Sequence, residues 1–162
     1  MKTLWAPWRI RYIESPKPKG CFICEAAEAK DDKVGYVIYR GKHSFILMNL
    51  YPYNPGHLMV ATYRHVGNLD DLSEDELFEL MKLTRFSIKI LNKAFNPQGF
   101  NIGINLGSVA GAGIEDHIHI HVVPRWLGDT NFMPILADVK VIPQALEETY
   151  EKLVKIAKKL TP

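Results

Sequence analysis

The chain has 162 residues, of which 47% are hydrophobic and 23% charged, and its formal net charge is +2. That length suffices for one domain that buries roughly 68–70% of the surface of the unfolded chain. The small charge gives no reason to expect nucleic acid as a partner, and the sequence shows neither a signal-peptide run nor the ~20 apolar residues that span a bilayer, so we expect a cytoplasmic protein that does not enter membranes.

A single domain is expected over residues 1–162. Its N-terminal arm, 1–20, is rich in tryptophan, proline and basic residues and is predicted to be irregular. The core follows over 21–125 and holds all the candidate chemistry, and a C-terminal tail and helix occupy 126–162.

The core begins with a predicted hairpin. Residues 35–40 and 43–49 are two apolar and β-branched runs on either side of a Gly-Lys turn. Two prolines and a glycine then predict another turn, and 57–62 predicts a third strand. Asn49, where the second strand ends, and His57, where the third begins, are by themselves more typical of structural positions than of functional ones.

A long amphipathic helix is predicted next, because Ser73 and Glu76 form a capping box and an Asn-Pro pair at Asn96 ends the pattern. Its expected buried stripe consists of Leu77, Leu80, Met81, Thr84, Ile88, Leu91 and Phe95. Three further elements complete the pattern: a strand over 100–105, a histidine-bearing strand over 117–123, and a closing helix over 143–160. Strand hairpins with one long helix between them predict an antiparallel α+β fold, a five-stranded sheet with a long helix and a C-terminal helix.

The histidine-bearing strand is the most informative stretch. His117, His119 and His121 alternate with isoleucines and a valine, and Pro124 is expected to end the strand. Side chains two residues apart share one face of a strand, so the three imidazoles should point one way and the aliphatic side chains into the core. Five strand residues span about 13 Å, which is too far for one zinc ion to bind all three rings.

Two kinds of chemistry suit this row. A neutral imidazole can attack an electrophilic phosphorus while its neighbours move protons, and the middle ring, His119, is the predicted nucleophile with His121 as its proton-handling neighbour. Alternatively, the row itself holds a catalytic metal through two of its rings. The glycine-rich loop over 106–113 supplies unhindered backbone N–H groups for phosphate oxygens, although alone it is better interpreted as a flexible loop.

The only two cysteines, Cys21 and Cys24, form a C-x-x-C motif. A redox pair, half of a zinc site and two packed thiols all fit this spacing. No second C-x-x-C exists to complete a site with four sulfurs, so the missing ligands of a zinc site would be histidines. His65 and His117 are the preferred candidates for a closed Cys₂His₂ site.

The run from His117 to Val123, histidine and hydrophobic residues in alternation followed by two hydrophobic residues, resembles the signature of the histidine triad family. The likeness extends over about 21–125. It implies an α+β fold, a homodimer that joins two five-stranded sheets, and nucleotidyl transfer at an α-phosphate through the middle histidine. It also implies that His119 is the nucleophile and that His121 and His57 line its phosphate site.

Further site residues follow from the same likeness. Asn49 and Asn105 would lie near the nucleotide. At Gly113 and Ile114 many members carry a hydroxyl or glutamine side chain that contacts phosphate, so backbone groups of the loop before the histidine strand would take this role here. The loop residues concerned are Ser108, Gly111 and Gly113.

The resemblance assigns the cysteines as well. Cys21, Cys24, His65 and His117 match the zinc ligands of those members that carry C-x-x-C, and the zinc would be structural. The terminal segments are similar to a prokaryotic branch that includes diadenosine polyphosphate phosphorylases and hydrolases. We therefore expect cleavage of a dinucleoside polyphosphate. The alternatives are a phosphorylase that uses inorganic phosphate, a nucleoside phosphoramidate hydrolase, and a nucleotide-binding protein without activity.

Overall fold

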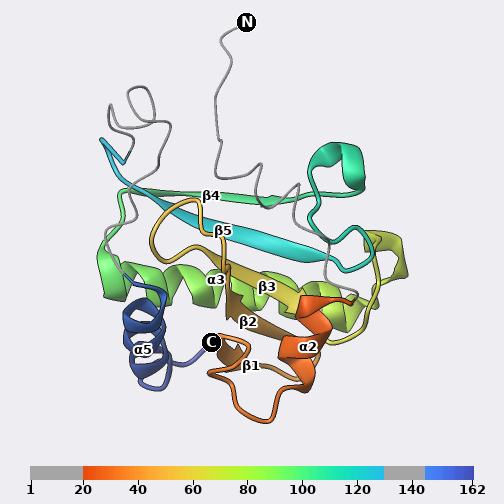
Figure 1. The fold of residues 1–162 in the computed structure, drawn as a ribbon, viewed down its shortest axis with the longest axis horizontal. Helices are drawn as coiled ribbons and strands as arrows, with labels where there is room; N and C mark the ends of the chain where they lie inside the picture. Colours follow the sequence, from red (N-terminus) through yellow and green to blue (C-terminus); the bar gives the residue numbers. More distant parts are fainter. Residues whose placement is uncertain (1–19, 130–144) are drawn as a thin grey trace, which may run out of the picture.

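The structure is a computed structural model that describes residues 20–129 and 145–162. Its centre is a five-stranded antiparallel sheet with the strand order β1-β2-β3-β5-β4 (Figure 1). The strands are β1 (Val37–Arg40), β2 (Ser44–Met48), β3 (Leu58–Thr62), β4 (Gly99–Ile104) and β5 (His119–Arg125). The predicted α+β fold is therefore confirmed.

Helices cover both faces of this sheet. They are α2 (Phe22–Glu28), α3 (Glu74–Phe95) and α5 (Leu146–Ala157), and two short 3-10 turns are η1 (Leu69–Asp71) and η2 (Ser108–Ala110). Helices α3 and α5 contact each other on one face, whereas α2 lies against the opposite face (Figure 1). No helix among the described residues is long and apolar enough to cross a membrane.

The alternation in β5 gives each face of the sheet its own role. Ile118, Ile120 and Val122 are buried in the main core beneath α3 and α5. A second apolar cluster on the other face joins Ile23 of α2 to Phe45 of β2. The imidazoles of β5, directed away from the main core, consequently stand on the α2 side of the sheet.

The strand also corrects one expectation, because Pro124 lies inside β5 instead of ending it. Pairing between β3 and β5 reaches only to Leu58 and Val122, whereas β4 continues to pair with β5 as far as Arg125. Beyond Val122 the strand therefore has a neighbour on one side only, and a proline without an N–H group is tolerated there.

Helix α3 begins with the predicted capping box between Ser73 and Glu76, but its buried stripe differs from the expected one. Leu77 and Met81 are 39% and 61% exposed. Leu80, Thr84 and Leu91 are buried as expected, and the buried stripe also contains Leu83, Phe86, Ile90 and Ala94. Apolar residues occur on more than one side of this helix, so periodicity alone admitted two stripes and packing against the sheet selected one.

Helix α5 is described from Leu146, so the part of the predicted helix at 143–144 lies outside the described residues, as do residues 1–19 of the predicted arm. Helix α2 was not predicted, because a seven-residue helix after a glycine gives little periodic signal.

Candidate functional site

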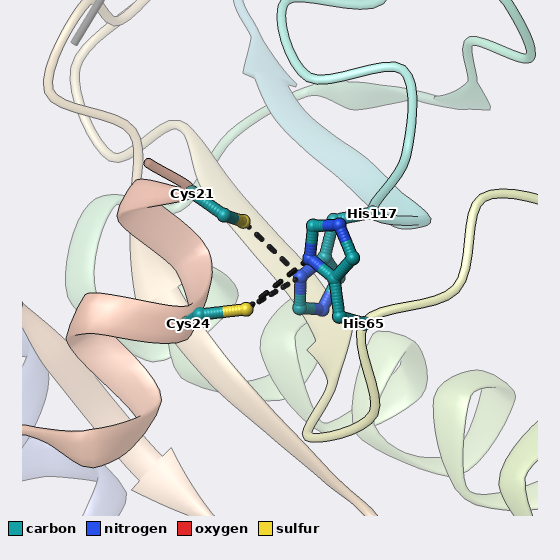
Figure 2. Close-up of side chains that lie close together, drawn as sticks. All are labelled: Cys21, Cys24, His65 and His117. Carbon is teal, nitrogen blue, oxygen red and sulfur yellow. Dashed lines mark hydrogen bonds between the residues drawn. The ribbon is translucent and has the colours of Figure 1, made fainter. Parts of the chain in front are cut away.

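The two cysteines and two of the histidines converge at one end of the sheet. Cys21 is the N-cap residue of α2 and Cys24 lies in its first turn. Figure 2 shows both thiols directed at the imidazoles of His65, on the loop after β3, and His117, just before β5. One potential ligand atom from each residue lies within 4.8 Å of every other.

Main-chain contacts bring the two histidines together. The N–H of Ile118 donates to the carbonyl oxygen of Val66 at 2.7 Å, which ties the start of the histidine strand to the loop that carries His65. The loop after β3 and the segment before β5 approach each other closely at Gly67, where a Cβ atom would lie 2.8 Å from the carbonyl oxygen of Glu115. A glycine is therefore required at that position.

The tautomer of His117 suits metal binding. Its Nε2 lies 2.8 Å from the carbonyl oxygen of Thr62, which can only accept, so Nε2 carries the proton. The lone pair of Nδ1 then faces the two thiols, 3.2 Å from Sγ of Cys21 and 3.4 Å from Sγ of Cys24. Burial lowers the pKa of His117, which further favours the neutral form.

These distances between sulfur and nitrogen atoms fit the tetrahedral coordination of one metal ion. Zinc bonds to sulfur and imidazole nitrogen of the usual lengths place such ligand atoms roughly 3.5 Å apart. The distance between Sγ of Cys24 and Nδ1 of His65 is 3.3 Å, close to that value. Burial raises the pKa of the Cys24 thiol to about 11, and the neighbouring Cys21 adds to this shift. Such a thiol ionises at neutral pH when a cation lies beside it.

A second group of imidazoles lies further along β5. His119 is buried, with 5% of its surface exposed, and its Nδ1 lies 2.8 Å from the carbonyl oxygen of His117. The carbonyl can only accept, so the proton is on Nδ1 and the lone pair is on Nε2. Burial lowers the pKa of His119, and the neutral ring is the nucleophilic form.

His121 and His57 form a connected pair beside this ring. The backbone N–H of Tyr53 donates to Nδ1 of His57 at 3.2 Å, so the proton of His57 is on Nε2. That Nε2 lies 3.0 Å from Nδ1 of His121, to which it donates. A neutral His121 then carries its own proton on Nε2. The rings of His119 and His121 are 4.8 Å apart between centroids and nearly perpendicular.

The turn before β3 holds His57 in place. His57 itself is fully buried, and Gly56 has a positive φ of 79°. A Cβ atom at Gly56 would lie 2.9 Å from the Phe95 ring and 3.0 Å from Leu91. Both the backbone conformation and the close approach to α3 therefore require a glycine here.

The predicted nucleotide-binding residues occupy two loops. The side chain of Asn49 accepts from the N–H of Tyr51 at 2.8 Å. Asn105 is the first residue after β4, whose last residue, Ile104, pairs with Ile120 of β5. Asn105 therefore follows directly on the part of β4 that lies beside His119 and His121. Its side chain donates to the carbonyl oxygen of Gly111 at 3.3 Å.

The glycine-rich loop after Asn105 is shaped by its glycines and by η2. Gly111 adopts a positive φ of 87° at the end of η2, and Ser108, at its start, is exposed. Gly113 is half-buried. Ile114 packs against the apolar cluster beneath α2, so its side chain serves the core instead of replacing a polar phosphate contact.

A network of polar residues that was not predicted closes the far end of β5. Asn54 is buried and its Nδ2 donates to the carbonyl oxygen of Pro124 at 2.9 Å and to Asp129 at 2.8 Å. Asp129 also accepts two hydrogen bonds from Arg125, at 2.6 and 3.0 Å. The Arg125 guanidinium holds the pKa of the Asp129 carboxyl well below its usual range. The network ties the turn before His57 to the end of β5.

The family of the chain follows from comparison with known proteins. The model of the HIT domain, the histidine triad domain, matches residues 30–126. The chain therefore belongs to the histidine triad family, as the resemblance implied.

Individual relatives are consistent with this family. AP-4-A phosphorylase of Mycobacterium tuberculosis is 43% identical in an alignment that covers 92% of this chain and 80% of that protein. Bis(5'-adenosyl)-triphosphatase of Dictyostelium discoideum is 30% identical over 76% of this chain and 67% of its own length. The fold is also similar to that of a Zn-bound histidine triad family protein from Mycobacterium smegmatis, with a TM-score of 0.68 and 22% identity over 86% of this chain and 94% of that one.

Proposed function

We propose that the protein cleaves dinucleoside polyphosphates at an α-phosphate through a covalent nucleotidyl-histidine intermediate. The observation that carries this proposal is the state of His119, a buried neutral ring whose Nδ1 donates to a main-chain carbonyl and whose Nε2 keeps its lone pair. Nε2 attacks the α-phosphorus, a P–N bond forms, and the bond from phosphorus to the bridging oxygen breaks. The bond electrons leave with that oxygen on the departing nucleotide.

His121 is assigned to the departing oxygen. Its Nε2–H, fixed by the hydrogen bond that Nδ1 accepts from His57, donates a hydrogen bond to that oxygen and stabilises the negative charge that leaves with it. Asn49 and Asn105 are proposed to contact the nucleoside. Phosphate oxygens would be bound by backbone N–H groups of the glycine-rich loop, which include those of Ser108, Gly111 and Gly113.

The acceptor in the second step decides the reaction class. Water gives a hydrolase, whereas inorganic phosphate gives a phosphorylase, and the P–N bond to His119 breaks in both. Inorganic phosphate is the second candidate acceptor. It is supported by the relative at 43% identity, which is named a phosphorylase. A phosphoramidate hydrolase would differ only in its leaving group.

Product analysis tests the proposal. Diadenosine tetraphosphate is incubated with the protein, with and without inorganic phosphate, and the nucleotides are separated by chromatography. A hydrolase yields AMP under both conditions, whereas a phosphorylase yields ADP in place of AMP when phosphate is present. Failure to consume the substrate under both conditions would leave the protein a nucleotide-binding member without activity.

We also propose that Cys21, Cys24, His65 and His117 hold a structural zinc ion. A closed set of four protein ligands leaves no position for substrate, so the ion would act by joining α2 to the start of β5. Its thiolate ligands require a reducing compartment, and this supports a cytoplasmic location.

A homodimer is the expected assembly. Strand β4 is an edge strand of the sheet, and its residues Asn101, Ile102 and Gly103 are exposed. Such an edge presents backbone groups that a second copy of the strand can pair with, which would join two five-stranded sheets. Light scattering should give twice the mass of one chain.

A further inference from the structure

We propose that Tyr53 is the positioning residue that orients His121 as the hydrogen-bond donor to the departing oxygen. This inference rests on the proposed function of the same site. Tyr53 lies in the turn before β3 and is half-buried. Its backbone and its ring make separate contacts with the histidine pair, and both contacts act on the same ring of His57.

The backbone contact sets the tautomers. Because the N–H of Tyr53 donates to Nδ1 of His57, a neutral His57 has its proton on Nε2. That proton is directed at Nδ1 of His121, 3.0 Å away, and this obliges a neutral His121 to protonate its Nε2. The orientation of a single peptide group thus determines which nitrogen of His121 can donate.

The ring contact holds the orientation of these imidazoles. The rings of Tyr53 and His57 are stacked, with centroids 5.0 Å apart and an angle of 21° between their planes. The Tyr53 ring also lies tilted beside His121, at 6.3 Å. The Tyr53 ring, stacked on one face of His57, opposes a flip of the His57 ring, which would exchange Nδ1 and Nε2 and break the chain of hydrogen bonds.

Buried Asn54, the next residue, anchors the turn that presents Tyr53. Its side chain donates to the carbonyl oxygen of Pro124, so the peptide before it is held relative to β5. The carbonyl oxygen of Asn54 accepts from the N–H of His57 at 3.1 Å. The contact between Tyr53 and the histidine pair is therefore part of a rigid turn, which is what a positioning role requires.

Three variants test the role of the ring. Tyr53→Leu removes the aromatic face, and Tyr53→Phe keeps it. Tyr39→Leu is the matched control, because the Tyr39 ring packs edge-on against Phe86 in the main core, on the other face of the sheet. The tautomers of His57 and His121 are read from the ¹⁵N chemical shifts of labelled histidine, and kcat and KM are measured with diadenosine tetraphosphate.

Tyr53→Leu is expected to replace the single Nε2–H form of His121 by a mixture of tautomers and to lower kcat roughly tenfold or more, with KM within about twofold. Tyr53→Phe should retain both the tautomer and kcat. Tyr39→Leu should lower the melting temperature and change neither. Unchanged tautomers and kcat in Tyr53→Leu would overturn the proposal. A tautomer change in a protein that does not consume the substrate would support the positioning role while the proposed function fails.

Discussion

The carbonyl oxygen of His117 lies 2.8 Å from Nδ1 of His119, so the residue whose imidazole lies in the cluster with Cys21, Cys24 and His65 also sets the tautomer of the neighbouring imidazole through its main chain. The side chain and the backbone of one residue thus serve two different sites. Any displacement of His117 changes the position of the acceptor that holds the proton of His119, and this couples the two sites through a single peptide group.

His119→Ala should abolish cleavage of diadenosine tetraphosphate and prevent the covalent nucleotide adduct, because no other lone pair replaces Nε2 at that position. Mass spectrometry of the acid-quenched protein detects the adduct, and the zinc content is measured on the same sample. Bound zinc should be unchanged, since the hydrogen bond between His117 and His119 uses the main-chain carbonyl of His117 and not its imidazole. Zinc loss in this variant would contradict the division between metal ligands and nucleophile, and retained turnover would contradict the assignment of His119.

Cys24→Ser should weaken zinc binding more than tenfold and lower the melting temperature, because a thiolate ligand is lost while the second cysteine remains. A fall in kcat should accompany zinc loss, since His117 would be held less firmly. Zinc content is measured by atomic emission after dialysis against a chelator. Ser108→Ala, an exposed site on the glycine-rich loop, is the control and should keep its zinc. Full zinc occupancy in Cys24→Ser would refute the proposed ligand set.

Glu76→Gln should destabilise the protein at neutral pH by about 1 kcal/mol, the usual contribution of a helix cap. The hydrogen bonds from Arg64 and from Ser73 hold the pKa of Glu76 at about 2, compared with 4.5 for the free side chain. A depressed pKa gives stability that is present above pH 4.5 and is lost as the pH falls towards 2.

The difference between wild type and Glu76→Gln should accordingly shrink between pH 4.5 and 2. Urea titrations at several pH values give the free energy of unfolding. Glu74→Gln, an exposed change in the same helical turn, should cost little at any pH. A difference that stays constant down to pH 2 would show that the carboxylate charge of Glu76 is not what stabilises the helix start.

Asn54→Ala should cost about 1–3 kcal/mol, because the carbonyl oxygen of Pro124 and the Asp129 carboxylate each lose a hydrogen-bond donor in a buried setting. The free energy of unfolding is obtained from urea titration. Asn68→Ala is the matched control, since Asn68 is exposed and bonds only locally to Asp71 at 3.3 Å. Equal small effects of the two substitutions would mean that the contact to Pro124 adds nothing to stability.

Much of this architecture could be predicted from the sequence because it depends on periodicity. The alternation around His119 gave both the strand and the face on which the imidazoles stand, and the capping box gave the start of α3. The proximity of Cys21 and Cys24 to His65 and His117 required the family likeness, since no spacing along a chain reveals which loops meet in space. The assigned roles of these residues and of His119 stay predictions.

Other features were out of reach for a definite reason. The tautomer of His119 depends on a main-chain carbonyl, which every residue possesses, so it leaves no signal in the amino-acid types. Tyr53 stood in a segment that proline and glycine marked only as a turn. Leu77 and Met81 were placed in the core because nothing in the helix pattern says which apolar side will meet the sheet.

The alternation in β5 has a consequence for how the chain can change in length. The three imidazoles lie on one face, and Ile118, Ile120 and Val122 lie on the other. Both placements depend on the same alternation of side chains along the strand. Inserting one residue after His117 would exchange the faces downstream, placing His119 and His121 under α3 and their aliphatic neighbours in the reaction site. Such a one-residue shift in register would abolish folding and chemistry together. Insertions and deletions should therefore be tolerated in the flanking loops and not within the strand.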